Sequence, residues 1–201
     1  MNCEGVTLVL GDRQAQMLLA APHEGTLKGT RDRAILAMLL SHGLRCEELC
    51  TLTVGRLRQR EGVPHVRVAG KGDKGHDLPF HVTPQRLIAA CLQEVGHAKD
   101  LKGPLFRPIK YNPTKTLAKP LHPVSVYQDI VRHYVRAVSL LDTVPGLCVH
   151  SRRATAPNAL AHEADIAKVQ EWLGHSDSSP TRMYDKRQSR PEDSPTFNVP
   201  Y

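Results

Sequence analysis

The chain has 201 residues, of which 40% are hydrophobic and 23% charged, a globular composition that excludes a wholly disordered or fibrous protein. This length accommodates one domain with a sizeable core. No apolar run approaches the roughly 20 residues of a membrane helix, and the first residues lack the features of a secretory signal, so we expect a cytoplasmic protein that binds no membrane. Lysine and arginine outnumber aspartate and glutamate by 27 to 20, which favours a polyanionic partner.

The cysteines argue against two stabilising devices of small domains. They are odd in number and form no Cys-x-x-Cys pair, so neither a disulfide framework nor a zinc ribbon is indicated. We therefore expect reduced thiols at all five positions: Cys3, Cys46, Cys50, Cys91 and Cys148.

Helices are predicted for the first part of the chain. Asp12 can cap a first helix that stops at Pro22. Thr30 can cap a second, whose apolar residues recur at helical spacing until Gly43 supplies a left-handed C-terminal turn. A further helical turn is expected over residues 46–52.

The hydrophobic period changes to two between Arg56 and His81, which predicts a strand, a turn and a strand of a small antiparallel sheet. Thr83 and Pro84 then form a cap and first-position pair for a helix that ends at Gly96.

Helix dominates the remainder. Residues 103–121 are rich in proline and lysine and are expected to form a surface loop before a helix over about 125–141. Helices are also predicted for residues 151–161, 165–173 and 178–184. The predicted fold class is α+β, mainly α-helical with a small antiparallel β-sheet.

Six polar residues stand out by their order along the chain, although each alone has an ordinary structural explanation. One follows the Gly43 break, one lies in the predicted hairpin turn, an H-x-x-R pair begins a helix, and a histidine and a tyrosine flank the start of the last helix. They are Arg45, Lys71, His150, Arg153, His175 and Tyr184.

Together these residues resemble the active site of the tyrosine recombinases, the phage integrase family. The strings GLRCEEL, VAGKGDK and HSRRAT resemble its first arginine box, its lysine hairpin and its H-x-x-R box. The string DIAKVQEWLGHSDSSPTRMYDKR resembles the family's final box, which contains its histidine and its tyrosine nucleophile. The similarity runs from about Glu4 to Tyr201. The resemblance implies a catalytic domain over residues 1–187, a C-terminal tail over 188–201, and no N-terminal core-binding domain.

The chemistry of phosphodiester cleavage explains why arginines and a tyrosine would be used. Attack on the phosphate spreads negative charge over its non-bridging oxygens, which Arg45 and Arg153 can clamp with paired donors. The resemblance implies that Tyr184 is the nucleophile, forming a 3′-phosphotyrosine, and that His150 takes its proton.

The resemblance implies further roles around the same phosphate. Lys71 would protonate the leaving 5′ oxygen, with Lys74 as the alternative, and His175 would donate a hydrogen bond. Glu48 follows Arg45 by three residues and could hold the arginine side chain.

The implied function is that of a site-specific recombinase or integrase of a mobile element, acting on double-stranded DNA without metal or nucleotide cofactor. The implied assembly is a homotetramer on DNA, with a separate N-terminal DNA-binding half as a possible further partner. Two alternatives stay open: a catalytically inactive DNA-binding remnant or accessory module, and relaxation of supercoils in the manner of a type IB topoisomerase.

Overall fold

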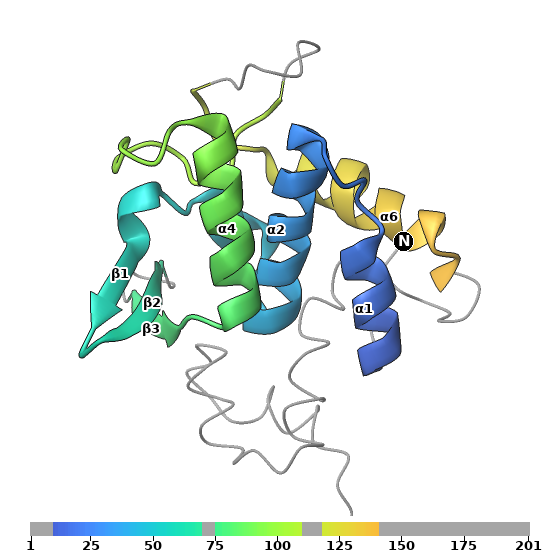
Figure 1. The fold of residues 1–201 in the computed structure, drawn as a ribbon, viewed down its shortest axis with the longest axis horizontal. Helices are drawn as coiled ribbons and strands as arrows, with labels where there is room; N and C mark the ends of the chain where they lie inside the picture. Colours follow the sequence, from blue (N-terminus) through green and yellow to red (C-terminus); the bar gives the residue numbers. More distant parts are fainter. Residues whose placement is uncertain (1–9, 70–74, 110–117, 141–201) are drawn as a thin grey trace, which may run out of the picture.

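A computed structural model describes residues 10–69, 75–109 and 118–140, in which helices pack beside a three-stranded antiparallel sheet (Figure 1). This confirms the predicted fold class. The elements are α1 (Asp12–Ala20), α2 (Leu27–His42), α3 (Cys46–Cys50), η1 (Val54–Arg56), β1 (Leu57–Arg60), β2 (Val63–Val68), β3 (His76–Pro79), α4 (Val82–Val95), α5 (Pro123–Ser125), the π-helical η3 (Val126–Arg132) and α6 (His133–Ala137).

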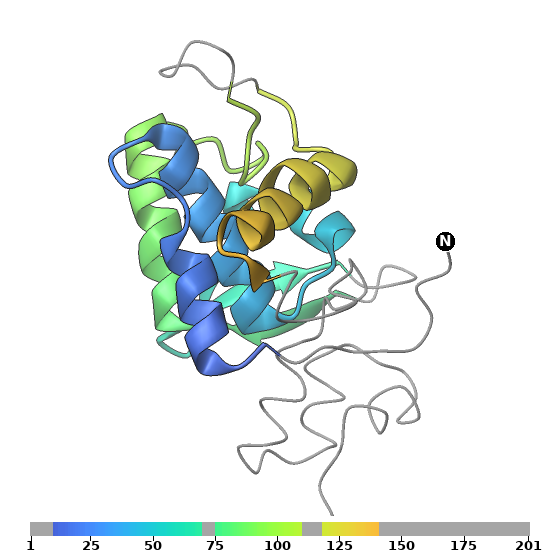
Figure 2. The same ribbon diagram turned by 90° about the vertical axis from the view of Figure 1, so that its right-hand side faces the viewer.

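Helix α2 is the centre of the described core. Its residues Ala34, Ile35 and Met38 have no exposed surface, and α2 packs along α4. Seen from the side, α4 lies on one side of α2 and the helical segment of residues 123–137 on the other (Figure 2). Because apolar neighbours cover α2 on two sides, it tolerates almost no polar residue without a partner.

The start of α2 differs from the prediction. Its N-cap is Thr26, whose hydroxyl accepts a 3.0 Å hydrogen bond from the backbone N–H of Gly29, so Thr30 lies inside the helix. A Cβ on Gly29 would stand 1.9 Å from the carbonyl oxygen of His23. Gly29 therefore allows the preceding segment to cross closely over the first turn, and it does not break the helix. The predicted end at Gly43 is confirmed, with a φ of 59°.

Two other caps were also assigned one or two residues too late. Gly11 is the N-cap of α1, and its N–H donates to the side chain of Gln14 at 2.9 Å, so Asp12 is the first helical residue. His81 caps α4 by accepting from the N–H of Thr83 at 3.3 Å. Pro84 thus lies in the first turn, where its missing N–H costs no hydrogen bond.

The sheet has three strands in the order β1-β2-β3, one more than the prediction had distinguished. β1 and β2 are joined by a two-residue turn in which Glu61 and Gly62 both have positive φ, at 51° and 79°, the geometry that suits a tight hairpin. On β2 and β3, Val66, Val68 and Leu78 are at most 3% exposed. One face of the sheet is therefore buried.

The segment after the loop begins at Pro123, two residues before the predicted helix start, and its regular part ends at Ala137. A π-helical stretch, η3, lies in its middle. Val126, Ile130 and Tyr134 face inward, at 0%, 2% and 6% exposed. The predicted end of this helix, at residue 141, lies outside the described residues.

A buried carboxylate joins α2 to α6. Asp32 has no exposed surface, and its Oδ1 accepts from Arg31 Nε at 2.8 Å and Nη2 at 2.6 Å. Its Oδ2 accepts from Lys28 Nζ at 2.7 Å and from the Tyr134 hydroxyl at 3.0 Å. Arg31 Nη1 also donates to the carbonyl of Arg107 at 3.2 Å. Asp32 is the acceptor of four donors from two helices, so it fixes how they pack.

Three of the five cysteines lie in the described residues. Cys46, Cys50 and Cys91 are free and buried, as expected for reduced thiols. Burial raises the pKa of Cys50 to about 12 and that of Cys91 to about 11, so both are protonated at neutral pH. Cys3 and Cys148 lie outside the described residues.

Among the described helices, none is long and apolar enough to cross a membrane.

Candidate functional site

Arg45 lies at the surface between buried neighbours. The left-handed Gly43 ends α2, and Arg45 adopts an extended conformation, with φ of −73° and ψ of 151°, as the N-cap of α3. Leu44 and Cys46 on either side are 2% and 6% exposed, whereas the Arg45 side chain is 44% exposed. The buried residues thus anchor this turn while the guanidinium reaches solvent.

Glu48 accepts hydrogen bonds from both the backbone and the side chain of Arg45. Its Oε2 accepts from the Arg45 backbone N–H at 2.7 Å, and its Oε1 accepts from Nη1 of the same residue at 2.5 Å. The expected contact between the two side chains is therefore present. Only one guanidinium nitrogen is used in this way, and within the described residues no other hydrogen bond of the guanidinium is seen. The Arg45 guanidinium is oriented and still has donors for an anion.

The turn that carries Arg45 lies close to the base of the β2–β3 hairpin. His76 pairs with Val68 where the two strands approach the turn. Burial lowers the pKa of His76, although the nearby carboxylates of Glu48 and Asp77 oppose that effect. The Glu48 carboxylate therefore acts on His76, and Glu48 contacts Arg45 in turn. Arg45 is thus linked through Glu48 to the base of the hairpin formed by β2 and β3.

His42 supports this arrangement from inside and was not predicted. It is the last residue of α2 and is 2% exposed. Its Nε2 accepts from the N–H of His81 at 3.3 Å, and its ring centroid lies 5.3 Å from that of Phe80. Burial lowers the pKa of His42 to about 4, so the neutral ring connects the turn before Arg45 to the start of α4. A polar residue in the last turn of an apolar helix was the signal available in the sequence.

The other predicted site residues lie outside the described residues. These are Lys71 with its alternative Lys74, and His150, Arg153, His175 and Tyr184. Whether they gather around one anion with Arg45 stays a prediction. In the described ranges, no group of three or more His, Cys, Asp or Glu side chains is arranged to hold a metal ion.

Removing the Glu48 side chain is expected to destabilise the turn modestly. In Glu48→Ala the Arg45 N–H and guanidinium lose their acceptor, which should lower the free energy of unfolding by about 1 kcal/mol. Urea denaturation of both proteins measures the difference. Glu47→Ala is the matched control, because Glu47 is an exposed carboxylate in the same helical turn. Equal losses in the two variants would mean that the contact with Arg45 contributes nothing.

Comparison with known proteins agrees with the predicted resemblance. The family model described as "Phage integrase family" matches residues 9–190. The tyrosine recombinase XerD of Xanthomonas campestris pv. campestris is 33% identical over 187 residues, covering 87% of this chain and 54% of the relative. XerD of Pseudomonas putida is 34% identical over 176 residues, covering 87% of this chain and 56% of the relative. The chain thus spans about half the length of these curated relatives.

Solved structures have the same fold. The XerA recombinase crystal structure superposes with a TM-score of 0.70 at 18% identity, covering 96% of this chain and 66% of that one. The XerH site-specific recombinase bound to its difH substrate, in a pre-cleavage complex, gives a TM-score of 0.68 at 19% identity, covering 89% of this chain and 50% of that one.

Proposed function

Because the chain belongs to the phage integrase family, we propose that it cleaves and rejoins DNA as a site-specific recombinase, through a covalent 3′-phosphotyrosine on Tyr184. The observation that carries the proposal is Arg45, a guanidinium oriented by Glu48 at 2.5 Å with donors left for an anion. The charge interaction of Glu48 with His76, at the base of the hairpin strands that lead to Lys71, supports the same assignment.

The proposed reaction is a transfer of the phosphoryl group between two oxygens. The Tyr184 oxygen attacks the phosphorus, and its proton passes to His150. The bond from phosphorus to the 5′ oxygen breaks, and Lys71 supplies the proton that this oxygen takes up. Arg45 and Arg153 hold the non-bridging oxygens, where charge grows in the transition state, and His175 donates a further hydrogen bond.

The resulting phosphotyrosine retains the energy of the broken phosphodiester bond. Attack by the 5′-hydroxyl of another strand reverses the step and releases Tyr184, so the scheme needs neither a metal ion nor a nucleotide. XerH was crystallised with its difH substrate; for this chain, double-stranded DNA as substrate and a homotetramer on that DNA are part of the proposal.

A nicked suicide duplex tests the proposal. After cleavage beside the nick, the short fragment carrying the 5′-hydroxyl diffuses away, so the protein stays attached to DNA and migrates as a larger species on a denaturing gel. We expect this adduct with the wild type and none with Tyr184→Phe, which lacks the attacking oxygen.

Two controls separate the alternatives. Both proteins should bind the duplex with equal salt dependence, which shows that the Tyr184→Phe variant is folded. Equal DNA retention with no adduct from either protein, on any duplex derived from the native flanking DNA, would favour the inactive DNA-binding module. Relaxation of supercoiled plasmid through many turns in one cleavage event would favour the topoisomerase.

A further inference from the structure

The three-stranded sheet has two faces of opposite chemistry. Because strand residues alternate between faces, the buried Val66 and Leu78 share one face, and their neighbours in sequence lie on the other. The register sets Arg58 opposite His65, and Arg67 opposite Asp77. This second face, here called the arginine face, has its cations on Arg58, Arg60 and Arg67.

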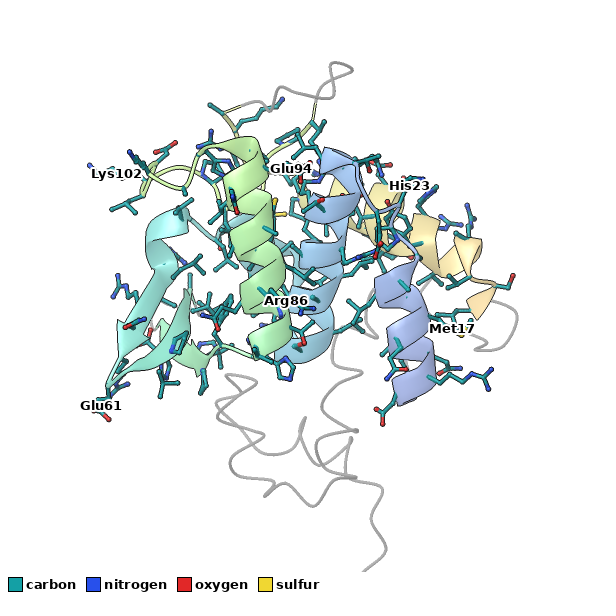
Figure 3. All side chains as sticks on the ribbon, viewed as in Figure 1. Met17, His23, Glu61, Arg86, Glu94 and Lys102 are labelled. Atoms are coloured by element: carbon teal, nitrogen blue, oxygen red, sulfur yellow. The ribbon has the colours of Figure 1, made fainter. Side chains whose placement is uncertain are left out.

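The arginine face has a clear excess of positive charge. Among the described strand residues, Asp77 is the only carboxylate on it, and Glu61 lies in the turn beyond the strand ends (Figure 3). Arg58 and Arg60 are exposed. Three arginines on adjoining strands repel one another in water, and a row of phosphates would relieve that repulsion.

Arg67 is held at the hairpin end of this face. Its Nη1 donates to Asp77 Oδ2 at 2.9 Å, with side-chain exposures of 40% and 21%. The guanidinium also lies against Gly75, where an added Cβ would come within 3.0 Å of Nε. The residues around Lys71 connect β2 to Gly75, so the arginine face begins beside the hairpin of the candidate site. From there it extends along β2 for roughly 20 Å, at about 3.3 Å per residue.

The ion pair between Arg67 and Asp77 is weak enough for a phosphate to replace Asp77 as the partner of Arg67. Partly exposed pairs of this type contribute only about 0–1 kcal/mol to stability, whereas a phosphate offers Arg67 the same charge-assisted geometry without a fixed competitor. If the ion pair instead served only to stabilise the hairpin, as a structural brace, Arg67 would stay paired with Asp77 when DNA is bound. The two roles predict different effects of removing each partner.

We propose that the arginine face binds the phosphates of the DNA backbone and that Asp77 competes with phosphate for Arg67 in the free protein. The inference rests on the proposed function in taking DNA as the ligand. It adds a contact surface that extends from the hairpin along the sheet, and it assigns Asp77 the role of weakening that contact.

Fluorescence anisotropy with a labelled duplex, titrated with the full chain at several salt concentrations, tests the surface. Arg58→Gln/Arg60→Gln should weaken binding by roughly 5- to 10-fold per arginine at about 0.1 M salt and lower the log–log salt slope by about 0.9 per phosphate contact. Arg67→Gln should also weaken binding, whereas Asp77→Asn should strengthen it.

A control of equal charge identifies the surface. Arg13→Gln/Arg86→Gln removes two exposed arginines outside the sheet, one on α1 and one on α4, and should leave the salt slope near the wild-type value. Arg86 is labelled in Figure 3. Equal effects of the two double variants would overturn the proposal, as would Arg67→Gln and Asp77→Asn both weakening binding, the result expected of a brace. Thermal unfolding of each variant verifies that it is folded.

The same samples separate this inference from the proposed function. If the wild type forms the Tyr184 adduct but the sheet variants bind DNA as the control does, only the arginine face is wrong. If the predicted pattern of affinities is seen without any adduct, the surface stands and the cleavage proposal fails. If the wild type shows no salt-dependent DNA binding, both are wrong.

Discussion

Asp32→Ala is expected to lower the free energy of unfolding by about 3–5 kcal/mol, because it leaves a buried charge without its partner. Arg31 is 7% exposed and donates two of its hydrogen bonds to Asp32. Its remaining partner is the carbonyl of Arg107 at 3.2 Å. Without Asp32, the guanidinium would stay in the interior unneutralised or pull the start of α2 out of the core.

Urea denaturation followed by circular dichroism measures this loss. Two further variants show how much of it comes from one hydrogen bond and how much any loss of a carboxylate would cause. Tyr134→Phe removes one neutral donor to Asp32 and should cost about 1 kcal/mol. Glu94→Gln removes an exposed carboxylate of α4 and should change stability by no more than about 0.5 kcal/mol. An Asp32→Ala loss as small as that of Glu94→Gln would show that this network does not hold α2 against α6.

The buried hydrogen-bond network around Asp32 was not predicted from the sequence. The helical spacing of Ala34, Ile35 and Met38 predicted a helix here, and that was right, but residues 34–38 are all buried, so the helix has no single apolar face. No prediction was made from the sequence for the charged residues ahead of it, Arg31 and Asp32, which are buried. Their burial depends on Tyr134, which is 102 residues from Asp32 in sequence. Local periodicity does not reveal a contact between residues so far apart in sequence.

The misplaced caps have a similar physical origin. Thr30 and Thr83 were predicted as the N-caps of two helices. At α4, however, the ring of His81 accepts from the N–H of Thr83. At α2, the helix begins earlier because the segment at His23 crosses over Gly29. Tertiary contacts thus decided the helix starts, whereas the ends at Gly43 and Gly96, which depend on the glycine's own left-handed conformation, were predicted correctly.

The candidate site was predictable where it depends on near neighbours in sequence. Arg45 and Glu48 are three residues apart, and their contact is present as expected. The charge interaction of Glu48 with His76 was not predicted, because it depends on the register in which β2 pairs with β3, which local sequence patterns do not fix. Long-range geometry of this kind is also what the remaining predicted site residues require.

The protein is also expected to lose stability in mild acid through His42. In the unfolded chain a histidine has a pKa of about 6.5, whereas burial lowers the pKa of His42 to about 4 in the folded protein. Between these values the unfolded state binds more protons than the folded state. The free energy of unfolding should therefore be fully retained above pH 6.5 and fall as the pH drops towards 4. At 1.36 kcal/mol per pKa unit, the loss from this one group is up to about 3 kcal/mol.

Chemical denaturation at a series of pH values measures this effect, and His42→Gln isolates it. The glutamine side-chain oxygen can still accept from the His81 N–H but does not titrate, so the acid-dependent loss should shrink by His42's share. The pKa values of His76 and His97 are also lowered by burial, and their contributions remain in both proteins and cancel in the difference. His133→Gln, at an exposed position, should leave the pH curve unchanged. Parallel curves for wild type and His42→Gln would mean that the folded protein accommodates a charged His42, and that the turn before Arg45 does not depend on its neutral ring.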